Sequence, residues 1–451
     1  MMKNLLRNGV LSLMLGLLLS CGGGGGGGTA FVPLSTPGAA GSTGAAGSTG
    51  AAGSPSAAGD SSPAGNGIGG IASDDGSSTT ASSGDDGSGV GSGGTGVSTA
   101  DATGVGAVDG AGSIFVNGLR YDTRTAVGHV EDAPAGLQLG MSAQVIGPVN
   151  ADFTQGVALR IESAADLRGA VTSVDPAQGS FVILGTTVTT DEATVWADAA
   201  GLAAIPAGRV LQVWGLPAAP GVLRATRVEQ RDASAAPILT GTVQNLDATR
   251  RIFSLGGLVV DYGGAVLGAS PDGRALANGT LVRVRATAAS PGSLVATLVQ
   301  WWYPLPTANA ATAQFAGIVT DFAGLGSLRA RGFPVDASAA QVTGGPVGSI
   351  GNGVKVEVGG TISGGVLRAT KLKIRHVPGT GGPASFTLIG NVGGFNSSAD
   401  FRVKGQPVDA GGPEVVFING SAANLRNGVR VNIGGTRVVD GVLKAGTVTF
   451  E

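Results

Sequence analysis

The side chains that most often perform chemistry in proteins are scarce in this sequence. It contains one cysteine, Cys21, and two histidines, His129 and His376, among 451 residues. A single cysteine excludes a disulfide framework, a cysteine-based zinc site and exchange with a second thiol. Neither histidine has the sequence context of a zinc or serine-nucleophile motif. We therefore predict that both histidines lie on the surface of loops or strands, that the chain is not an enzyme, and that it holds no metal or cofactor.

Aspartate recurs at one position of a repeated pattern, and this recurrence could suggest a carboxylate pair. The residues concerned are Asp122, Asp261, Asp336 and Asp409. General acid–base catalysis needs two titratable groups within one cleft, whereas these aspartates are separated by a whole repeat. An aspartate at the end of a strand commonly accepts a hydrogen bond from the backbone of the following turn. We predict this turn-capping role for each of them.

The remaining candidate site is an aromatic cluster, Trp301-Trp302-Tyr303, followed by Pro304. Exposed aromatic rings stack on sugars or form the centre of protein contacts. The alternation of a strand could equally turn Trp301 or Trp302 into a core while the other rings pack against the next repeat. The sequence therefore leaves two interpretations of this cluster open, namely ligand contact and packing.

The N-terminus has the layout of an export signal. Lys3 and Arg7 precede an apolar run at residues 10–19, which is shorter than the ~20 residues that a membrane-spanning helix needs. The run ends in Leu18-Leu19-Ser20-Cys21, which resembles the bacterial lipobox. We predict a signal peptide at residues 1–20 and attachment of lipid, including palmitate, to Cys21. Two or three acyl chains would anchor the protein permanently in the membrane, and Gly22 in place of aspartate favours the outer membrane.

Residues 21–103 are rich in Gly, Ser, Ala and Thr and are predicted to form a disordered tether, because they offer too little apolar surface to offset the entropy of ordering. Seven aspartates and no lysine or arginine lie between Cys21 and Leu119. The remainder, residues 120–451, has a net charge of only about +3, which is too weak and too dispersed for a nucleic-acid footprint. We therefore expect no nucleic-acid partner.

Two short patterns recur five times each in residues 104–451. The first is a glycine followed three residues later by an aromatic or β-branched residue, usually before aspartate. It begins at Gly118, Gly185, Gly257, Gly332 and Gly405. The second is G-x-x-Φ-x-Φ-x-G, where Φ is apolar, and its third copy ends in Ala286. It begins at Gly140, Gly208, Gly279, Gly353 and Gly428. Both patterns advance by about 70 residues per copy, which indicates tandem repeats.

Each repeat alternates apolar and polar residues in the manner of short β-strands. We predict three strands joined by tight turns, a short helical link, and a final hairpin. Five strands in this order suit a small barrel of the OB type, while a five-stranded sandwich gives the same pattern. The expected fold is therefore all-β, with five such repeats following the tether. Their expected bounds are 104–165, 169–232, 238–303, 314–377 and 386–451.

The repeated motifs G-x-V, F-x-V-x-G-x-x-V-D, G-x-x-V-x-V-x-G and L-x-A-T-x-V resemble the bacterial domain-of-unknown-function family 5666, over about residues 104–451. This resemblance implies export and a small β-fold, and it implies no activity. We expect a structural or interaction protein of the cell envelope, anchored in the outer membrane through its lipid and facing the periplasm or the cell surface. Its partner would be an envelope protein or a glycan. The alternative is a carbohydrate-binding surface protein that uses Trp301, Trp302 and Tyr303.

Overall fold

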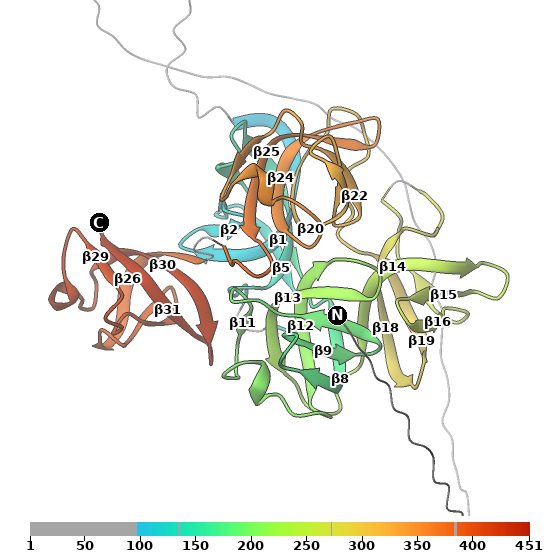
Figure 1. The fold of residues 1–451 in the computed structure, drawn as a ribbon, viewed down its shortest axis with the longest axis horizontal. Coiled ribbons are helices and arrows are strands. Elements are labelled where there is room, and N and C mark those ends of the chain that lie inside the picture. The colour runs from blue at the N-terminus through green and yellow to red at the C-terminus, as the bar shows by residue number, and fades with distance from the viewer. Residues whose placement is uncertain (1–96, 134–135, 272, 383–385) are drawn as a thin grey trace, which may run out of the picture. The chain divides into compact units, whose positions relative to one another are not determined.

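The computed structural model describes residues 97–133, 136–271, 273–382 and 386–451. They fold into five small β-barrels, which we number 1 to 5 in chain order (Figure 1). The expected all-β fold with tandem repeats is therefore confirmed. The expected signal peptide, Cys21 and most of the expected tether lie outside the described residues. Within the described ranges, no helix is both long and apolar enough to cross a membrane.

Barrel 2 shows the strand order that all five barrels share. Its elements are β8 (Leu167–Asp175), β9 (Ser180–Ile183), β10 (Thr186–Thr189), β11 (Val195–Trp196), the 3-10 turn η1 (Leu202–Ala204), β12 (Val210–Pro217) and β13 (Val222–Gln230). Antiparallel pairs join β8 to β9, β9 to β10, β12 to β13 and β12 to β8. Strands β10 and β13 pair in parallel and close the ring. A closed ring of five strands is the OB-type barrel, the first of the two expected alternatives.

The other barrels repeat this ring. Barrel 1 contains β1 (Val97–Ala111), β2 (Ile114–Val116), β3 (Leu119–Asp122), β4 (Val127–Val130), β5 (Ser142–Asn150), β6 (Gln155–Val157) and β7 (Arg160–Ser163). Barrel 3 contains β14 (Ile238–Asp247), β15 (Ile252–Leu255), β16 (Leu258–Asp261), β17 (Val266–Leu267), β18 (Leu281–Ser290) and β19 (Ser293–Trp301). In barrel 1, β3 pairs in parallel with β6, and in barrel 3, β16 pairs in parallel with β19. These pairings complete the two rings.

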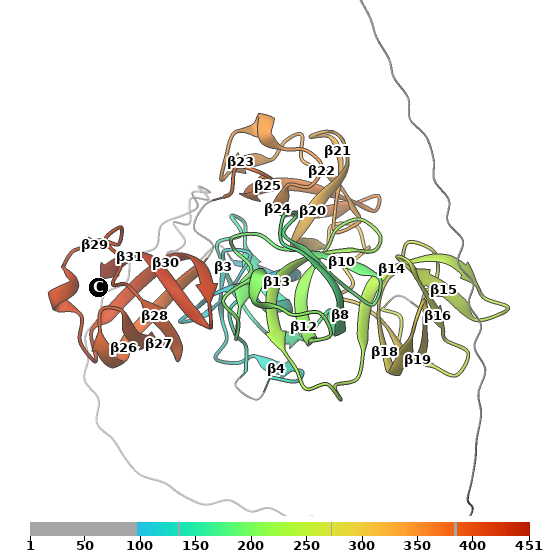
Figure 2. The same ribbon diagram turned by 60° about the horizontal axis from the view of Figure 1, so that its bottom comes forward.

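Barrels 4 and 5 each include a 3-10 turn in the position of η1. Barrel 4 contains β20 (Thr312–Gly324), β21 (Ser327–Ala330), β22 (Phe333–Asp336), β23 (Gln341–Thr343), η2 (Val347–Ser349), β24 (Lys355–Ser363) and β25 (Val366–His376). Barrel 5, whose strands are labelled in Figure 2, contains β26 (Phe386–Ser397), β27 (Asp400–Val403), β28 (Gln406–Asp409), β29 (Val416–Ile418), η3 (Ala422–Asn424), β30 (Arg430–Val439) and β31 (Val442–Phe450).

Two features differ from the expectation. Each barrel adds a short strand to the expected five, such as β11, which pairs in parallel with β13. In barrel 1, two strands, β6 and β7, also take the place of the single expected final strand. A strand of two to four residues is too short to give a periodic signal in the sequence. In addition, β1 begins at Val97, within the segment assigned to the tether. Its first residues are small and polar, so composition alone does not distinguish them from the preceding segment.

The glycines of the first pattern form tight hairpin turns. Leu184 and Gly185, which join β9 to β10, both have positive φ angles, 48° and 70°. Two consecutive residues of this kind make a type I′ turn, which matches the twist of the flanking strands. The pairs Asn117-Gly118, Arg331-Gly332 and Lys404-Gly405 repeat this geometry. The recurring glycine therefore sets the register of the second and third strands.

The glycine that ends the second pattern lies at a bulge in the first strand of the final hairpin, which is β24 in barrel 4. The pairing of β24 with β25 shifts in register between Gly359 and Gly360. A Cβ at Gly360 would lie 2.1 Å from the carbonyl oxygen of Arg368, so only glycine fits without a local shift. Barrel 3 carries Ala286 here, and its register shifts twice around this residue.

Several strands also pair between barrels. Strand β1 pairs in parallel with β20 of barrel 4 and with β26 of barrel 5. Strand β8 pairs with β14, which joins barrels 2 and 3. One sheet therefore contains strands of barrels 1, 4 and 5, and another contains barrels 2 and 3. Valine, leucine and isoleucine fill most of the interior, and one core cluster extends from barrel 2 into barrel 3.

Candidate functional site

Trp302 and Tyr303 lie directly after β19, and both side chains are buried, with exposed fractions of 8% and 3%. Their rings stack with centroids 4.1 Å apart. The Tyr303 hydroxyl accepts a hydrogen bond from the Ala164 backbone at 2.9 Å and donates one to the Ser142 carbonyl at 3.3 Å. The structure therefore corrects the ligand-contact interpretation for these two rings, because they pack against barrel 1. Trp301 ends β19 and is half-buried.

Asp166, in the link between barrels 1 and 2, is the polar centre of this junction. Its Oδ1 accepts a hydrogen bond from Trp302 Nε1 at 2.6 Å. Its Oδ2 accepts from Ser142 Oγ at 2.7 Å and from the Gly215 backbone at 2.8 Å. Burial raises the pKa of Asp166, and these hydrogen bonds oppose the rise. One carboxylate thereby connects barrel 1, barrel 2 and the segment after barrel 3.

Two buried arginines surround the same aromatic pair. Arg283 on β18 is fully buried, and its guanidinium lies 4.8 Å from the centre of the Trp302 ring. It donates to the Ala165 carbonyl at 2.7 Å and pairs with Glu131 at 2.7 Å. Arg331 of barrel 4 donates to the carbonyls of Trp302 and Tyr303, and burial lowers its pKa to about 10. We call Glu131, Asp166, Arg283, Trp302, Tyr303 and Arg331 the central junction.

A second buried polar contact joins barrels 1 and 4. Asp109 Oδ2 accepts from the Gly118 backbone at 2.8 Å and from Arg375 at 3.2 Å. Arg375 also pairs with Glu357 at 3.1 Å. Burial, together with the nearby charge of Glu357, raises the pKa of Asp109 to about 6, although the charge of Arg375 opposes the rise. Sequence reasoning missed both polar centres because an isolated Asp or Arg has no local pattern that reveals a distant partner.

The strand-end aspartates occupy separate barrels and cap turns, as expected. Asp336 Oδ1 accepts from the Ser338 backbone at 3.0 Å, and Asp409 Oδ1 accepts from Gly411 at 2.9 Å. Equivalent bonds reach Asp122 and Asp261. Some of these aspartates also form ion pairs, including Asp409 with Lys444 at 2.8 Å. Their partners hold the pKa of Asp122, Asp336 and Asp409 below the ordinary range. No two of these four carboxylates form a joint site.

The histidines also lie in different barrels. His129 is exposed on β4, whereas His376 ends β25 and is half-buried. Burial lowers the pKa of His376, and the charge of Asp191 opposes this change. Among the described residues, no group of three or more histidine, cysteine, aspartate or glutamate side chains has the arrangement of a metal site.

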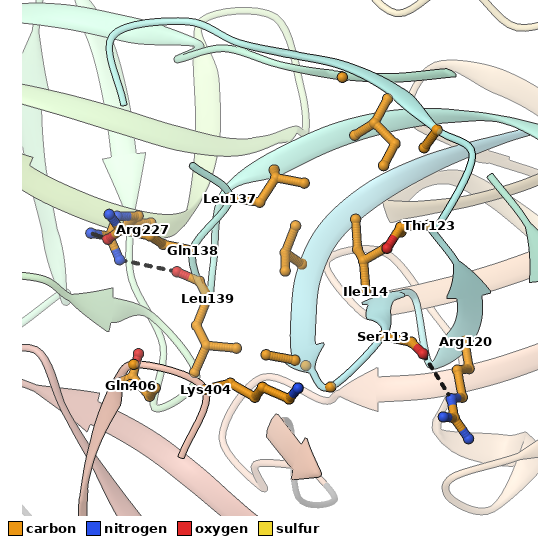
Figure 3. Close-up of a pocket in the computed structure, with 18 of the residues that line it drawn as sticks. Ser113, Ile114, Arg120, Thr123, Leu137, Gln138, Leu139, Arg227, Lys404 and Gln406 are labelled. Carbon is orange, nitrogen blue, oxygen red and sulfur yellow. Dashed lines mark hydrogen bonds between the residues drawn. The ribbon is translucent and has the colours of Figure 1, made fainter. Parts of the chain in front are cut away.

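A groove of about 1350 Å³ is lined by residues of barrels 1, 2 and 5. Figure 3 shows Arg120 and Ser113 on one side of it, Lys404 and Gln406 on another, and Arg227 beside Leu139. Lys404 lies in the turn between β27 and β28, and Arg120 lies on β3, so hairpins of two barrels supply the exposed cations. Sequence reasoning missed this groove because its walls come from three separate repeats.

The cationic side chains that line the groove differ in their hydrogen-bond and ion-pair partners. Arg227 is buried and donates to the Leu139 carbonyl at 3.1 Å, so it supports the wall. Arg124 pairs with Asp122 at 2.6 Å. Arg120 donates to Ser113 Oγ at 3.2 Å, and Lys404 is exposed. Within the described part of the chain, neither Arg120 nor Lys404 has a carboxylate partner. The groove therefore presents the cations Arg120 and Lys404 to solvent, and its wall also carries Asp122 and Asp440. The positive charge of Arg120 helps to lower the pKa of Asp122.

The closed rings and their buried junctions define a tandem-repeat protein built from OB-type β-barrels. In a comparison with known protein families, residues 168–229 and residues 240–300 each match the domain of unknown function DUF5666. The chain therefore contains two tandem copies of this domain, which correspond to barrels 2 and 3. No curated protein matches the chain.

Proposed function

We propose that this chain is a lipid-anchored protein of the bacterial outer membrane whose barrels bind another component of the cell envelope without catalysing a reaction. The observation that carries the binding role is the groove, since three barrels build its walls. The central junction supports this role because it joins barrels through buried hydrogen bonds and ion pairs. A surface assembled from several barrels can present a larger and more specific contact than one barrel alone.

The N-terminal sequence supports the anchor. Leu18-Leu19-Ser20-Cys21 follows a basic and then an apolar segment, which is the order of a lipoprotein signal. A lipid at Cys21 would retain the barrels at a membrane even though no described helix could cross one. We place the protein in the outer membrane, facing the periplasm or the cell surface, because Gly22 is not aspartate.

Labelling and fractionation test the anchor. Cells that express the full chain should incorporate radiolabelled palmitate into it and retain it in the outer-membrane fraction, whereas Cys21→Ala should abolish labelling and leave the precursor uncleaved. Ser20→Ala is the matched control, because it keeps both a small residue before the cleavage site and the thiol. Normal labelling of the Cys21→Ala variant would refute the anchor. Protease treatment of intact cells would separate the periplasmic from the surface location.

In-cell photocrosslinking tests the binding role. A photoreactive amino acid at Gln406, which lines the groove, should crosslink the full chain to an envelope component. The same amino acid at Arg250, an exposed residue of barrel 3, is the control. Equal crosslinking patterns from the two positions would contradict a binding role for the groove. The carbohydrate alternative loses its original support, because Trp302 and Tyr303 are buried.

A further inference from the structure

We propose that the groove between barrels 1, 2 and 5 binds an anionic oligosaccharide, whose carboxylate or phosphate groups contact a track of cationic side chains. This inference rests on the proposed function, because it names the ligand class of the same groove. It differs from the aromatic carbohydrate site expected from the sequence, which lies elsewhere and is buried.

The cations form a track that continues beyond the groove. A second hollow of about 470 Å³ on barrel 5 shares Lys404 and Gly405 with the groove and is lined by Arg402 and Arg430. Arg402 donates to the Gly405 carbonyl at 3.2 Å, and Arg430 pairs with Glu451 at 2.7 Å. Several cations along adjoining hollows suit an extended ligand with repeated negative charges better than a single small anion.

Neighbouring groups hold the two exposed cations Lys404 and Arg120 in place. Lys404 is the first residue of a type I′ turn with φ of 52°, and its side chain passes over Gly390, where a Cβ would lie 3.0 Å from Lys404 Cε. Arg120 lies on β3, which pairs with β2. Ser113 directly precedes β2, and its Oγ accepts a hydrogen bond from Arg120 Nε. Ser113 lines the groove and Gly390 lines the second hollow, so these contacts hold the two cations on the walls of the adjoining hollows (Figure 3). Such preorganisation lowers the entropic cost of binding.

The apolar part of the groove is poorly suited to a lipid chain. Ile114, Ile161 and Leu139 line the groove, but their exposed fractions are only 8%, 5% and 3%. Hydrophobic binding scales with the apolar area that a ligand removes from water. These side chains have little such area left, because they already pack within the barrels. A ligand of the groove therefore gains little affinity from these three side chains and needs polar contacts as well.

The charged side chains of the groove are four cations and two carboxylates, Asp122 and Asp440, so its wall keeps a positive balance. Its uncharged polar side chains match sugar hydroxyls. Ser113, Thr123, Gln138, Gln155 and Gln406 line the groove and offer hydroxyl or amide groups. None of the described residues that line it is aromatic, so it lacks the rings on which nucleobases or neutral sugars stack. Hydrogen bonds to hydroxyls together with charge-assisted bonds to acidic groups are the contacts that this wall can make.

Isothermal titration calorimetry with the full, detergent-solubilised protein tests the proposal. The probes are hexagalacturonate, a phosphorylated mannohexaose, neutral maltohexaose, and a single-stranded DNA of similar charge. We expect saturable binding of one or both acidic sugars, which also shows whether carboxylate or phosphate is the preferred group. Affinity should fall as salt rises, because exposed charges are screened. Arg120→Gln/Lys404→Gln should weaken binding by about tenfold or more, since it removes two charge-assisted contacts.

The matched control is Arg250→Gln/Arg426→Gln, which removes the same charge from exposed residues that do not line the groove. It should leave affinity unchanged. Circular dichroism and unfolding midpoints would verify that all variants are folded. The proposal would be overturned if neither acidic sugar bound, if the DNA bound as tightly as the acidic sugars, or if both double variants lost affinity to the same extent. These outcomes leave the membrane anchor untouched, because palmitate labelling tests it separately.

Discussion

The indole nitrogen of Trp302 donates a hydrogen bond of 2.6 Å to the carboxylate of Asp166, although the two residues are 136 positions apart. Asp166 precedes barrel 2, and Trp302 follows barrel 3. The bond therefore ties together the two ends of the segment that contains both copies of the matched family domain. Because the carboxylate is buried, its partners determine whether the junction is stable.

Removing this donor should destabilise the protein. Trp302→Phe keeps most of the ring packing but deprives Asp166 of one hydrogen bond. We expect the free energy of unfolding to fall by roughly 2 kcal/mol, because hydrogen bonds to buried charged groups contribute about 1.5–3 kcal/mol. Urea denaturation followed by fluorescence measures this change. Trp301→Phe is the control and should have a smaller effect, because Trp301 is only half-buried. Equal losses in the two variants would contradict a special role for the Trp302–Asp166 bond.

The pair formed by Arg283 and Glu131 should behave as a buried ion pair. Arg283 has an exposed fraction of 0% and would keep a buried charge without its carboxylate partner in Glu131→Ala. We expect a loss of about 3–5 kcal/mol in unfolding free energy. Adding Arg283→Met should recover part of that loss, because it removes the uncompensated charge. Glu162→Ala, which breaks an exposed pair with Arg160, should cost far less. A double variant less stable than Glu131→Ala would refute this account.

Asp109 should make stability depend on pH. Its folded pKa of about 6 lies above the ordinary value of 3.8, so the folded protein binds more protons between these pH values. Asp109 therefore lowers stability as pH rises from about 4 to about 6, by up to about 3 kcal/mol for a shift of about two units. The charged groups around it are Arg375, Glu357 and Lys373.

The variant Asp109→Asn isolates this effect. The difference in unfolding free energy between Asp109→Asn and the unmodified protein should change with pH in the window from about 4 to about 6 and be constant above it. The control Asp440→Asn changes an exposed aspartate whose positive φ asparagine also tolerates. Parallel curves for Asp109→Asn and the unmodified protein would show that Asp109 has an ordinary pKa.

A substitution at Gly360, the glycine that ends the second sequence pattern in barrel 4, tests whether the bulge there requires glycine. Gly360→Ala would place a Cβ 2.1 Å from the carbonyl oxygen of Arg368, and we expect a loss of roughly 2–4 kcal/mol in unfolding free energy. Gly393→Ala is the matched control, because a Cβ there meets no atom within 4 Å. Thermal unfolding measures both. Equal midpoints for the two variants would show that the bulge accommodates a side chain, as the alanine at position 286 suggests for barrel 3.

The sequence by itself determined the repeats, the all-β fold and the turn-capping aspartates. It also predicted a short helical link in each repeat, which the described residues show as a 3-10 turn in barrels 2, 4 and 5. These features depend on contacts between residues close in the chain: alternation decides which face of a strand is buried, and a glycine such as Gly185 permits the positive φ of a tight turn. The tertiary structure alone decided how the barrels join, why Trp302 and Tyr303 are buried, and which cations face the groove. Asp166 and Arg283 meet partners from other repeats, and the groove brings Arg120 of barrel 1 to the same surface as Lys404 of barrel 5. No local spacing encodes such distant relationships.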